Sequence, residues 1–238
     1  MSETIALSAM SVHRSRPDPA RGVFETLLVR EGRPLELEAH LARLGSSVET
    51  LYAQPLPAVR DAVLDHARGV PLGRLRLTAS PRDGGLATAI VVAPVVPAFV
   101  FPVAGVELSP LVVEGGIGPH KWVDRRLLTQ AEDGRALPLV VDEDGSVLEA
   151  SRANVFVVEG GSVVTPPADG RLLPGVTRAR VVGLAGVREE PIDLARLHAA
   201  DEVFLTGSVR GVEPVAGRDG PVTGLVAGQL RRHWEENP

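Results

Sequence analysis

The sequence predicts a mixed α/β fold of the α+β type. Short valine-rich runs recur along the chain and favour strands over a helical bundle, because β-branched side chains fit a pleated sheet. Apolar residues make up 44% of the 238 residues and aromatic residues only 3%, so we expect a core of Val, Leu, Ala and Ile. This length suffices for one large domain or for two small domains that share a cleft.

The N-terminal half is predicted to form a sheet with two helices. Apolar runs bounded by Gly, Pro or Asp indicate strands at Gly22–Arg30, Leu35–Leu37, Arg74–Ser80, Leu86–Val95 and Val106–Val113. Helical spacing indicates helices at Glu38–Tyr52 and Ala58–Arg68. On the first helix one face is apolar, and Arg43 and Ser47 are expected to lie off it. The apolar face consists of Leu41, Leu44, Val48 and Leu51.

The C-terminal half is predicted to begin with a helix after Lys121 and to continue as a β-meander over 136–165. A helix from about Val176 to Ala185, a strand at Asp201–Thr206 and a closing helix at Val222–Glu235 complete it. The glycine-rich run 115–119 is the expected linker. It separates a small N-terminal domain, 1–114, from a larger C-terminal domain, 120–238.

Composition limits the classes of function. A net charge of −5 argues against a nucleic-acid partner for the chain as a whole, although a local basic patch stays open. The absence of cysteine excludes disulfides and thiolate chemistry, and the six histidines lack metal-ligand spacing, so we expect no metal. Residues 1–16 lack a signal peptide, and prolines interrupt the apolar run 89–103. We therefore expect a soluble, cytoplasmic protein without a membrane partner.

Lys121 is the one lysine of the chain, since Lys and Arg total 25 and every other one is arginine. An amine can lose its proton and act as a nucleophile, whereas a guanidinium stays charged. Lys121 is therefore a candidate for covalent chemistry. The alternative is that one lysine remains by chance on a solvated face.

Four segments, in this order and spacing, resemble the fold-type IV, or class IV aminotransferase-like, pyridoxal-phosphate enzymes. They are residues 39–44, residues 120–125, residues 147–156 continuing to 165–167 and 172–178, and residues 201–208. This family includes branched-chain and D-amino acid aminotransferases and the 4-amino-4-deoxychorismate lyases, and the lyases are the most similar. The resemblance implies a small N-terminal α/β sandwich and a larger, β-barrel-like C-terminal domain with helices that binds the cofactor.

The resemblance also implies how pyridoxal 5′-phosphate is held. Lys121 would form the Schiff base and move a proton, and Glu149 would keep the pyridine nitrogen protonated. The phosphate would meet the first turn of a helix at Val176 and Thr177, where amides are unpaired. A second loop and a charged side chain would complete the phosphate site. These residues are Thr206, Gly207, Ser208 and Arg43.

Two neighbours of these residues receive lesser roles. Asn154 is expected on the face opposite Glu149, as a structural residue. His120 is expected to point away from Lys121, because adjacent strand side chains diverge.

Thr26 gives the best indication of which reaction follows. In the lyases a threonine at this place of the N-terminal strand contributes to catalysis; the alternative is a β-branched residue chosen for a strand. We therefore expect a lyase that converts 4-amino-4-deoxychorismate to 4-aminobenzoate and pyruvate. Arg152 and Arg82 are the candidates for binding the substrate carboxylates.

Three other functions stay open. The first is an aminotransferase on D- or branched-chain amino acids, the second a cofactor-free binding protein, and the third an Arg-rich nucleic-acid binder. The resemblance implies a homodimer. Residues 17–44 also resemble lyase domains fused to aminodeoxychorismate synthases, so such a synthase is a further expected partner in the pathway.

Overall fold

The computed structural model describes residues 11–132 and 134–237, and the chain divides into two compact units. The small unit comprises Pro17–Val100, His120–Arg125 and residues 232–237. The large unit comprises residues 11–16, Phe101–Pro119, and residues 126–132 and 134–231. The segment around Lys121 groups with the N-terminal half, although it follows the expected linker. The reason is that its backbone pairs with the first strand of the small unit.

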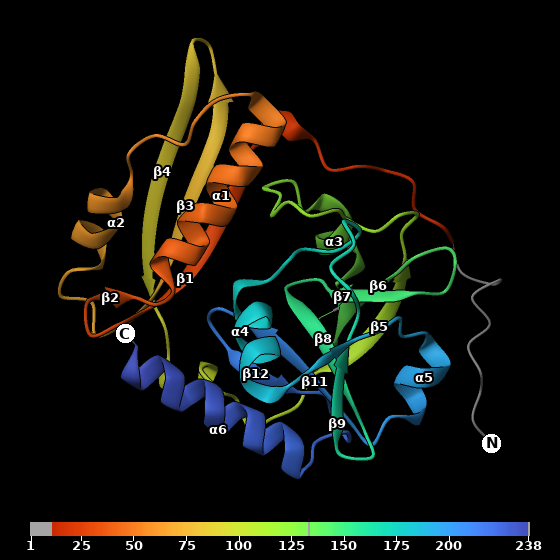
Figure 1. Ribbon diagram of the computed structural model, residues 1–238. Helices are drawn as coiled ribbons and strands as arrows, with labels where there is room; N and C mark the ends of the chain where they lie inside the picture. The colour runs from red at the N-terminus through yellow and green to blue at the C-terminus, as the bar shows by residue number, and fades with distance from the viewer. Residues whose placement is uncertain (1–10, 133, 238) are drawn as a thin grey trace. The chain divides into compact units, whose positions relative to one another are not determined.

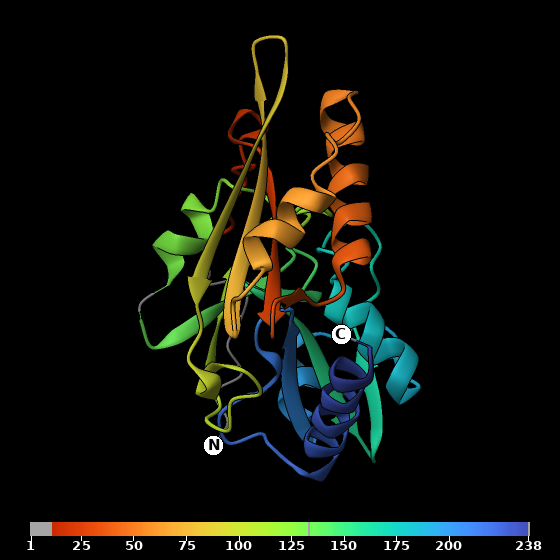
Figure 2. The ribbon, with the colours of Figure 1, turned by 90° about the vertical axis from the view of Figure 1, so that its left-hand side faces the viewer.

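A four-stranded sheet in the order β2-β1-β3-β4 forms the small unit. Its strands are antiparallel: β1 (Val23–Arg30), β2 (Arg33–Pro34), β3 (Leu72–Arg82) and β4 (Gly85–Pro94). Helices α1 (Leu37–Tyr52) and α2 (Arg60–Ala67) lie against one face of this sheet (Figures 1 and 2). Short 3-10 turns lie at Pro19–Arg21 and Pro97–Phe99.

Two expected strands of the small unit are wrong. The strand predicted at Val106–Val113 is β5 (Glu107–Val112), which belongs to the sheet of the large unit. The return strand predicted at Leu35–Leu37 is instead β2 at Arg33–Pro34, and Leu37 opens α1. Glu36 adopts a left-handed conformation at φ 54°, which turns the chain out of the strand before the helix begins.

The core of the small unit follows the alternation of β1. Val23, Leu27 and Val29 point toward the helices and pack with apolar residues of α1, α2 and β3. Helix α1 differs from the expectation in one respect, because Ser47 is buried at 5% exposure. The helix has a second buried face, on which His40 and Ser47 meet polar partners rather than the apolar core.

The large unit contains an eight-stranded sheet that forms a half-barrel, in agreement with the expected β-barrel-like domain (Figure 1). Its path runs β10-β9-β8-β7-β6-β5, with β11 paired to β8 and β12 paired to β11. The strands are β5 (Glu107–Val112), β6 (Ala136–Val141), β7 (Val147–Ala150), β8 (Ala153–Glu159), β9 (Ser162–Thr165), β10 (Arg188–Glu189), β11 (Glu202–Gly207) and β12 (Gly211–Pro214). The mixed α/β fold with its β-meander is therefore confirmed.

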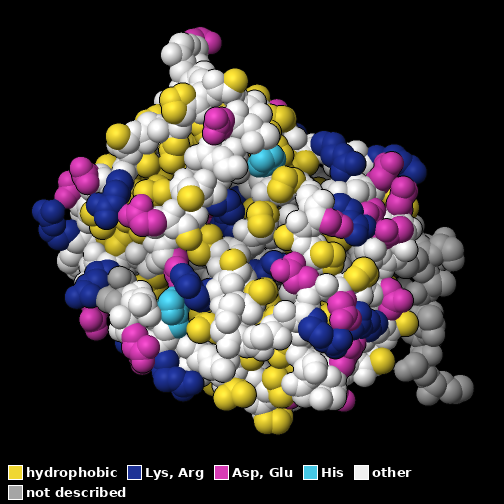
Figure 3. Space-filling model, viewed as in Figure 1, with side chains coloured by type: hydrophobic (Ala, Val, Ile, Leu, Met, Phe, Trp, Pro, Cys, Tyr) yellow, Lys and Arg dark blue, Asp and Glu magenta, His cyan; other side chains and the backbone are white. Residues whose placement is uncertain are grey.

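Four helices complete the fold: α3 (Arg126–Ala131), α4 (Val176–Ala185), α5 (Leu194–Ala199) and α6 (Pro221–Glu236). Among residues 11–132 and 134–237, no helix has the length and hydropathy needed to cross a membrane. Figure 3 shows acidic and basic side chains interspersed over the visible face, so that face offers no continuous basic surface to a nucleic acid.

Candidate active site

A short antiparallel pairing fixes the backbone of Lys121 against the start of β1. The amide of Phe24 donates to the carbonyl of Lys121 at 2.8 Å, and the amide of Val123 donates to the carbonyl of Gly22 at 3.0 Å. Gly22 lies at φ 96°, and a Cβ there would stand 2.4 Å from the carbonyl oxygen of Ala79. Glycine alone fits this close approach, so the local sequence determines where the lysine backbone lies.

The Lys121 side chain lies near the face of β1 that carries Phe24 and Thr26. Its Nζ is 5.2 Å from the centroid of the Phe24 ring. Glu25 points the other way, toward α1, because successive side chains of a strand alternate. Thr26 therefore shares a face with Phe24, and its cross-strand partner on β3 is Arg76. The structure thus brings the two predicted catalytic residues, Lys121 and Thr26, to one side of the sheet.

Arginines that the sequence reasoning missed lie on this same face. The guanidinium carbon of Arg76 is 3.7 Å from the centroid of the Phe24 ring. Burial, followed by the positive charges of Arg125 and Arg74, lowers the pKa of Arg76. In the described part of the chain, neither Arg74 nor Arg76 forms an ion pair with an acid. The alternation in residues 74–77 was the signal, because it places both arginines on one face of a strand.

His120 points away from this face. Its Nδ1 lies 3.0 Å from the Ser47 hydroxyl on α1, and its ring meets Trp122 edge-on at 5.3 Å between centroids. Burial lowers the pKa of the imidazole. His120 and Lys121 therefore diverge, as expected for neighbours on an extended segment.

Arg43, a predicted phosphate ligand, lies on the α1 side of β1. Its Nε and Nη2 each donate to the Glu25 carboxylate at 2.7 Å, and His40 Nδ1 lies 2.7 Å from the same carboxylate. Burial favours a raised pKa for Glu25, but hydrogen bonds from His40 and Arg43 outweigh it and lower the pKa to about 2. Burial lowers the pKa of His40, and the charges of Arg43 and Lys121 act in the same direction, against Glu25.

In the large unit, Glu149, Asn154 and Thr206 form one row across three strands. Glu149 pairs with Asn154 between β7 and β8, and Asn154 pairs with Thr206 between β8 and β11. The expectation that Asn154 faces away from Glu149 is therefore wrong. A tight turn at 151–152 reverses the chain, and directly opposed residues of antiparallel strands share a face.

Glu149 and Asn154 both hold the loop that leads into α4. The Leu173 amide donates to Glu149 Oε1 at 3.3 Å, and Asn154 Nδ2 donates to the Leu173 carbonyl at 2.9 Å. At Gly175 a Cβ would stand 2.0 Å from Asn154 Oδ1. Asn154 thus has the structural role that was expected of it, on the same face as Glu149.

The N-terminus of α4 lies beside the end of β11. Val176 opens the helix, and its N-cap Gly175 provides no side-chain cap. The Thr177 hydroxyl donates to Ser208 Oγ at 3.3 Å, just after Gly207 ends β11. The Thr206 hydroxyl is buried and has no hydrogen-bond partner among the described residues.

These observations test whether the residues fit the phosphate of the expected cofactor. An uncapped helix start supplies amide donors, and its dipole favours an anion. The hydroxyls of Thr177 and Ser208 are adjacent, and that of Thr206 still lacks a hydrogen bond within the described ranges. The large unit therefore holds a donor set that suits a phosphate, and Glu149 lies in the same row as Thr206.

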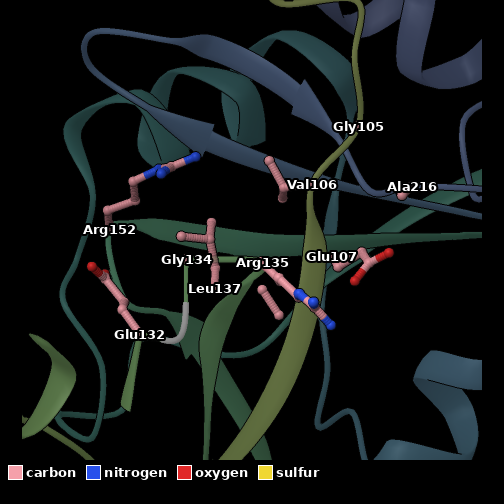
Figure 4. A pocket seen from close by; sticks show the side chains of 10 residues that line it. Gly105, Val106, Glu107, Glu132, Gly134, Arg135, Leu137, Arg152 and Ala216 are labelled. Atoms are coloured by element: carbon pink, nitrogen blue, oxygen red, sulfur yellow. The ribbon is translucent and has the colours of Figure 1, made fainter. Parts of the chain in front are cut away.

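Arg152 and Arg82, the expected ligands of substrate carboxylates, belong to different units. Arg152 belongs to the large unit, where its Nη2 donates to both Glu213 oxygens at 2.9 and 3.1 Å. It also lines a cavity of about 590 Å³ with Arg135 and Glu132 (Figure 4). Arg82 belongs to the small unit and is exposed at the end of β3.

Comparison with known protein families, sequences and structures agrees with this geometry. A family model described as amino-transferase class IV matches residues 22–104 and 120–217, which is most of the chain. This chain belongs to the class IV aminotransferase family. Enzymes of this family use pyridoxal 5′-phosphate, so the expected cofactor and enzyme class are confirmed at the level of the family.

Related sequences bear aminotransferase names. The class IV chain is 30% identical to branched-chain-amino-acid aminotransferase-like protein 1 of Arabidopsis thaliana over 92% of its own length. It spans only 45% of that relative. It is 29% identical to a putative branched-chain-amino-acid aminotransferase of Methanocaldococcus jannaschii, covering 84% of this chain and 80% of that one.

Solved structures confirm the class IV fold. A hypothetical aminotransferase from Mycobacterium tuberculosis in its PLP-bound form matches with a TM-score of 0.79 at 24% identity, covering 97% of this chain and 95% of that one. The 4-amino-4-deoxychorismate lyase of Pseudomonas aeruginosa matches with a TM-score of 0.77 at 25% identity, covering 94% and 96%. Both reactions considered from the sequence are thus represented among similar proteins.

Proposed function

We propose that this class IV enzyme is a lyase that converts 4-amino-4-deoxychorismate to 4-aminobenzoate and pyruvate. One observation carries the proposal: the Thr26 side chain is on the Lys121 side of the small sheet, and Arg76 is its cross-strand neighbour. The lyase needs a base, a proton donor for the leaving group and cations for the substrate carboxylates. Lys121, Thr26 and Arg76 are residues of those three kinds on one face.

The arginines of this face support a substrate with two carboxylates. Arg74 and Arg76 face the same side of β3, and Arg125 is close enough to Arg76 to affect its pKa. Neither Arg74 nor Arg76 has an acidic partner in the described ranges. A dianion would relieve the repulsion among these cations. Arg152 and Arg82 stay predictions, and we propose Arg76 as a further carboxylate ligand.

Residues of the large unit are proposed to bind the cofactor. Thr177, Thr206 and Ser208 would hydrogen-bond its phosphate, together with the amides at Val176 and Gly207. Glu149 would keep the pyridine nitrogen protonated through its negative charge. Arg43 would add a cation to the phosphate. Bound pyridoxal 5′-phosphate supplies an electron sink that stabilises the charge left when the substrate loses a proton.

The protein's own residues would then move two protons. Lys121 Nζ takes the proton from the ring carbon that bears the substrate amine. The bond from the neighbouring carbon to the enolpyruvyl oxygen breaks, and the Thr26 hydroxyl delivers a proton to that oxygen. Released enolpyruvate becomes pyruvate, and the ring becomes the aromatic 4-aminobenzoate.

An aminotransferase on D- or branched-chain amino acids is the second candidate. The names of the Arabidopsis and Methanocaldococcus relatives favour it. Its cofactor residues would be the same, and a 2-oxo acid would occupy the cationic face as amino acceptor. The two candidates therefore differ in product, not in cofactor binding.

The deciding experiment supplies 4-amino-4-deoxychorismate to the cofactor-loaded protein without any amino acceptor. The lyase releases 4-aminobenzoate, followed by fluorescence, and an equal amount of pyruvate, followed with lactate dehydrogenase. An aminotransferase releases neither, but converts D-alanine or L-leucine when 2-oxoglutarate is added. Absence of 4-aminobenzoate, with transamination present, would refute the lyase.

We also propose that the enzyme is a cytoplasmic homodimer. The resemblance to enzymes whose active sites are completed in dimers supports the dimer, and light scattering after size exclusion measures it. A mass equal to one chain, 25.1 kDa, would refute it. A functional link to an aminodeoxychorismate synthase stays a prediction of the lyase proposal.

A further inference from the structure

The cavity of about 590 Å³ in the large unit lies on the face of the sheet opposite Glu149 and Thr206. Its wall includes Leu137, which packs in one core cluster with Val155 and Leu205. Leu205 directly precedes Thr206 on β11, and successive side chains of a strand point to opposite faces. A ligand in this cavity would therefore be separate from the residues proposed to bind the cofactor.

A buried carboxylate holds two arginines on this face. Glu213 is 2% exposed and lies directly opposite Leu205 between β12 and β11, so it shares the face of that residue. Arg152 Nη2 donates to both of its oxygens, at 2.9 and 3.1 Å, and Arg210 Nη1 donates to Oε1 at 2.8 Å. Two guanidinium groups thus share one carboxylate, which leaves one positive charge in excess.

Arg152 is the member of this group that lines the cavity, and its side chain is 36% exposed. Among residues 11–132 and 134–237, its Nη1 and Nε make no hydrogen bond. The guanidinium is rigid and Glu213 fixes one end of it, so these donors are oriented before a ligand arrives. Burial lowers the pKa of Arg210, and the charge of Arg152 adds to this effect against Glu213. An anion in the cavity would balance the two cations.

An acidic side chain lies on the same side of the cavity as this cation. Glu132 Oε1 accepts a hydrogen bond from Ser151 Oγ at 3.0 Å, and Ser151 directly precedes Arg152. Glu132 Oε2 makes no hydrogen bond with any residue that the structure describes. In Figure 4, Arg152 and Glu132 lie at one side of the cavity, and Val106 and Leu137 lie next to them. The wall thus combines a cation, an acid and an apolar surface.

This combination selects a class of ligand. Arg152 suits a carboxylate, whereas Glu132 suits an ammonium group and would repel a second negative charge. Val106 and Leu137 offer contact to an aliphatic group but no side-chain hydrogen bond. The volume is within the range of small-molecule sites, about 300–1,000 Å³.

We infer that this cavity binds a free aliphatic amino acid, whose carboxylate contacts Arg152 and whose ammonium group contacts Glu132. The aliphatic side chain then packs against Val106 and Leu137. The inference does not depend on whether the enzyme is a lyase or an aminotransferase. It gives Arg152 a ligand other than the substrate carboxylate predicted from the sequence.

Calorimetric titration with L-leucine tests this site. The two comparison ligands are 4-methylpentanoate, which lacks the amine, and 3-methylbutylamine, which lacks the carboxylate. The cofactor-loaded protein is first reduced with borohydride, so that the cofactor cannot react with an added amine. L-Leucine should bind about tenfold more tightly than either analogue, because each analogue loses one charge-assisted hydrogen bond.

Two variants locate the bound leucine. Glu132→Gln should weaken binding of L-leucine about tenfold and leave that of 4-methylpentanoate unchanged, because it removes only the charge that meets the ammonium group. Arg152→Gln should weaken binding of both ligands by about the same factor. Glu143→Gln changes an exposed acid of the large unit and is the matched control, which should alter neither dissociation constant.

Three results would overturn the inference. The first is the absence of L-leucine binding to the reduced protein, and the second is equally tight binding of 4-methylpentanoate. The third is binding that Arg76→Ala weakens and Glu132→Gln does not, since the leucine would then occupy the arginine face of the small sheet. Glu132→Gln decides alone if Arg152→Gln does not fold, because glutamine can still accept the hydrogen bond from Ser151.

Discussion

The two faces of strand β1 carry opposite arrangements of charge. On the α1 side, the Glu25 carboxylate is sealed from solvent and saturated by His40 and Arg43. On the other side, Arg76 and Lys121 lie near Phe24, and Arg74 is close enough to Arg76 to lower its pKa. Neither arginine pairs with an acid in the described ranges. Residues adjacent in sequence, such as 25 and 26, therefore belong to different electrostatic environments.

This difference predicts that the two faces of one strand respond differently to substitution. Charges that are neutralised inside the protein hold a side chain in place, so their loss should reduce stability. Like charges near one another lower stability but can bind an anion, so their loss should reduce activity. Variants on the two faces therefore test whether the two sets of charges have different effects.

The largest effect on stability is expected for Arg43→Ala, on the α1 side of β1. It leaves Glu25 buried with His40 alone, and removal of one partner of a buried pair typically costs about 3–5 kcal/mol. The free energy of unfolding in urea measures this loss. Arg196→Ala breaks a similar fork that is about one-quarter exposed and should cost about 1 kcal/mol or less. Equal losses for the two variants would contradict the comparison.

Lowering the pH should reduce the free energy of unfolding through the Glu25 carboxylate. The pKa of Glu25 falls from 4.5 to about 2 on folding, so its contribution is complete above pH 4.5 and is lost as the pH falls from 4.5 toward 2. A shift of this size corresponds to about 3 kcal/mol of unfolding free energy. Glu25→Gln should lack this part of the acid dependence. A variant and wild type with parallel stability profiles over that range would refute the assignment.

Substitutions on the face of the sheet that carries Arg76 should change activity rather than stability. Arg76→Ala should lower kcat/KM for 4-amino-4-deoxychorismate by about 10- to 100-fold, the worth of a charge-assisted hydrogen bond. Its unfolding free energy should be unchanged or slightly higher, because a repulsive cation is removed. Arg68→Ala, on an exposed arginine at the end of α2, is the control and should alter neither quantity. A stability loss at Arg76 without a change in kcat/KM would reverse the assignment of the two faces.

The smallest effect is expected at Thr26. Thr26→Val keeps the β-branched shape but removes the hydroxyl, and should lower kcat about tenfold with little change in KM. Thr26→Ser keeps the hydroxyl and should retain most of the activity. If Val and Ser behave alike, the side chain has only a packing role in the strand.

Elements with strong local signals could be predicted from the sequence. Helix α4 begins and ends where it was expected, because Pro174 and Gly175 precede it and Gly186 follows in a left-handed conformation. The cofactor residues of the large unit also lie in contiguous segments, where a strand end or helix start supplies the donors. Short elements such as α5 and β12 were missed, since their few residues carry no periodic pattern.

Features that depend on pairing between distant segments could not be predicted. Asn154 was assigned to the wrong face because strand parity was counted through an unrecognised turn. The fork from Arg43 to Glu25 requires α1 to dock on β1, and the position of Arg76 opposite Thr26 requires the register between β1 and β3. The sequence indicated the chemistry of these residues but not their neighbours.

The most direct test of the account is the attachment of pyridoxal 5′-phosphate to Lys121. Wild-type protein with added cofactor should gain a visible absorption band that borohydride bleaches, and a peptide map should then place the cofactor on Lys121. The Lys121→Ala variant should show neither change, and its turnover should fall by at least about a thousandfold. If the variant gives the same band and retains turnover, Lys121 is not the cofactor lysine, and its proposed role as the base is refuted.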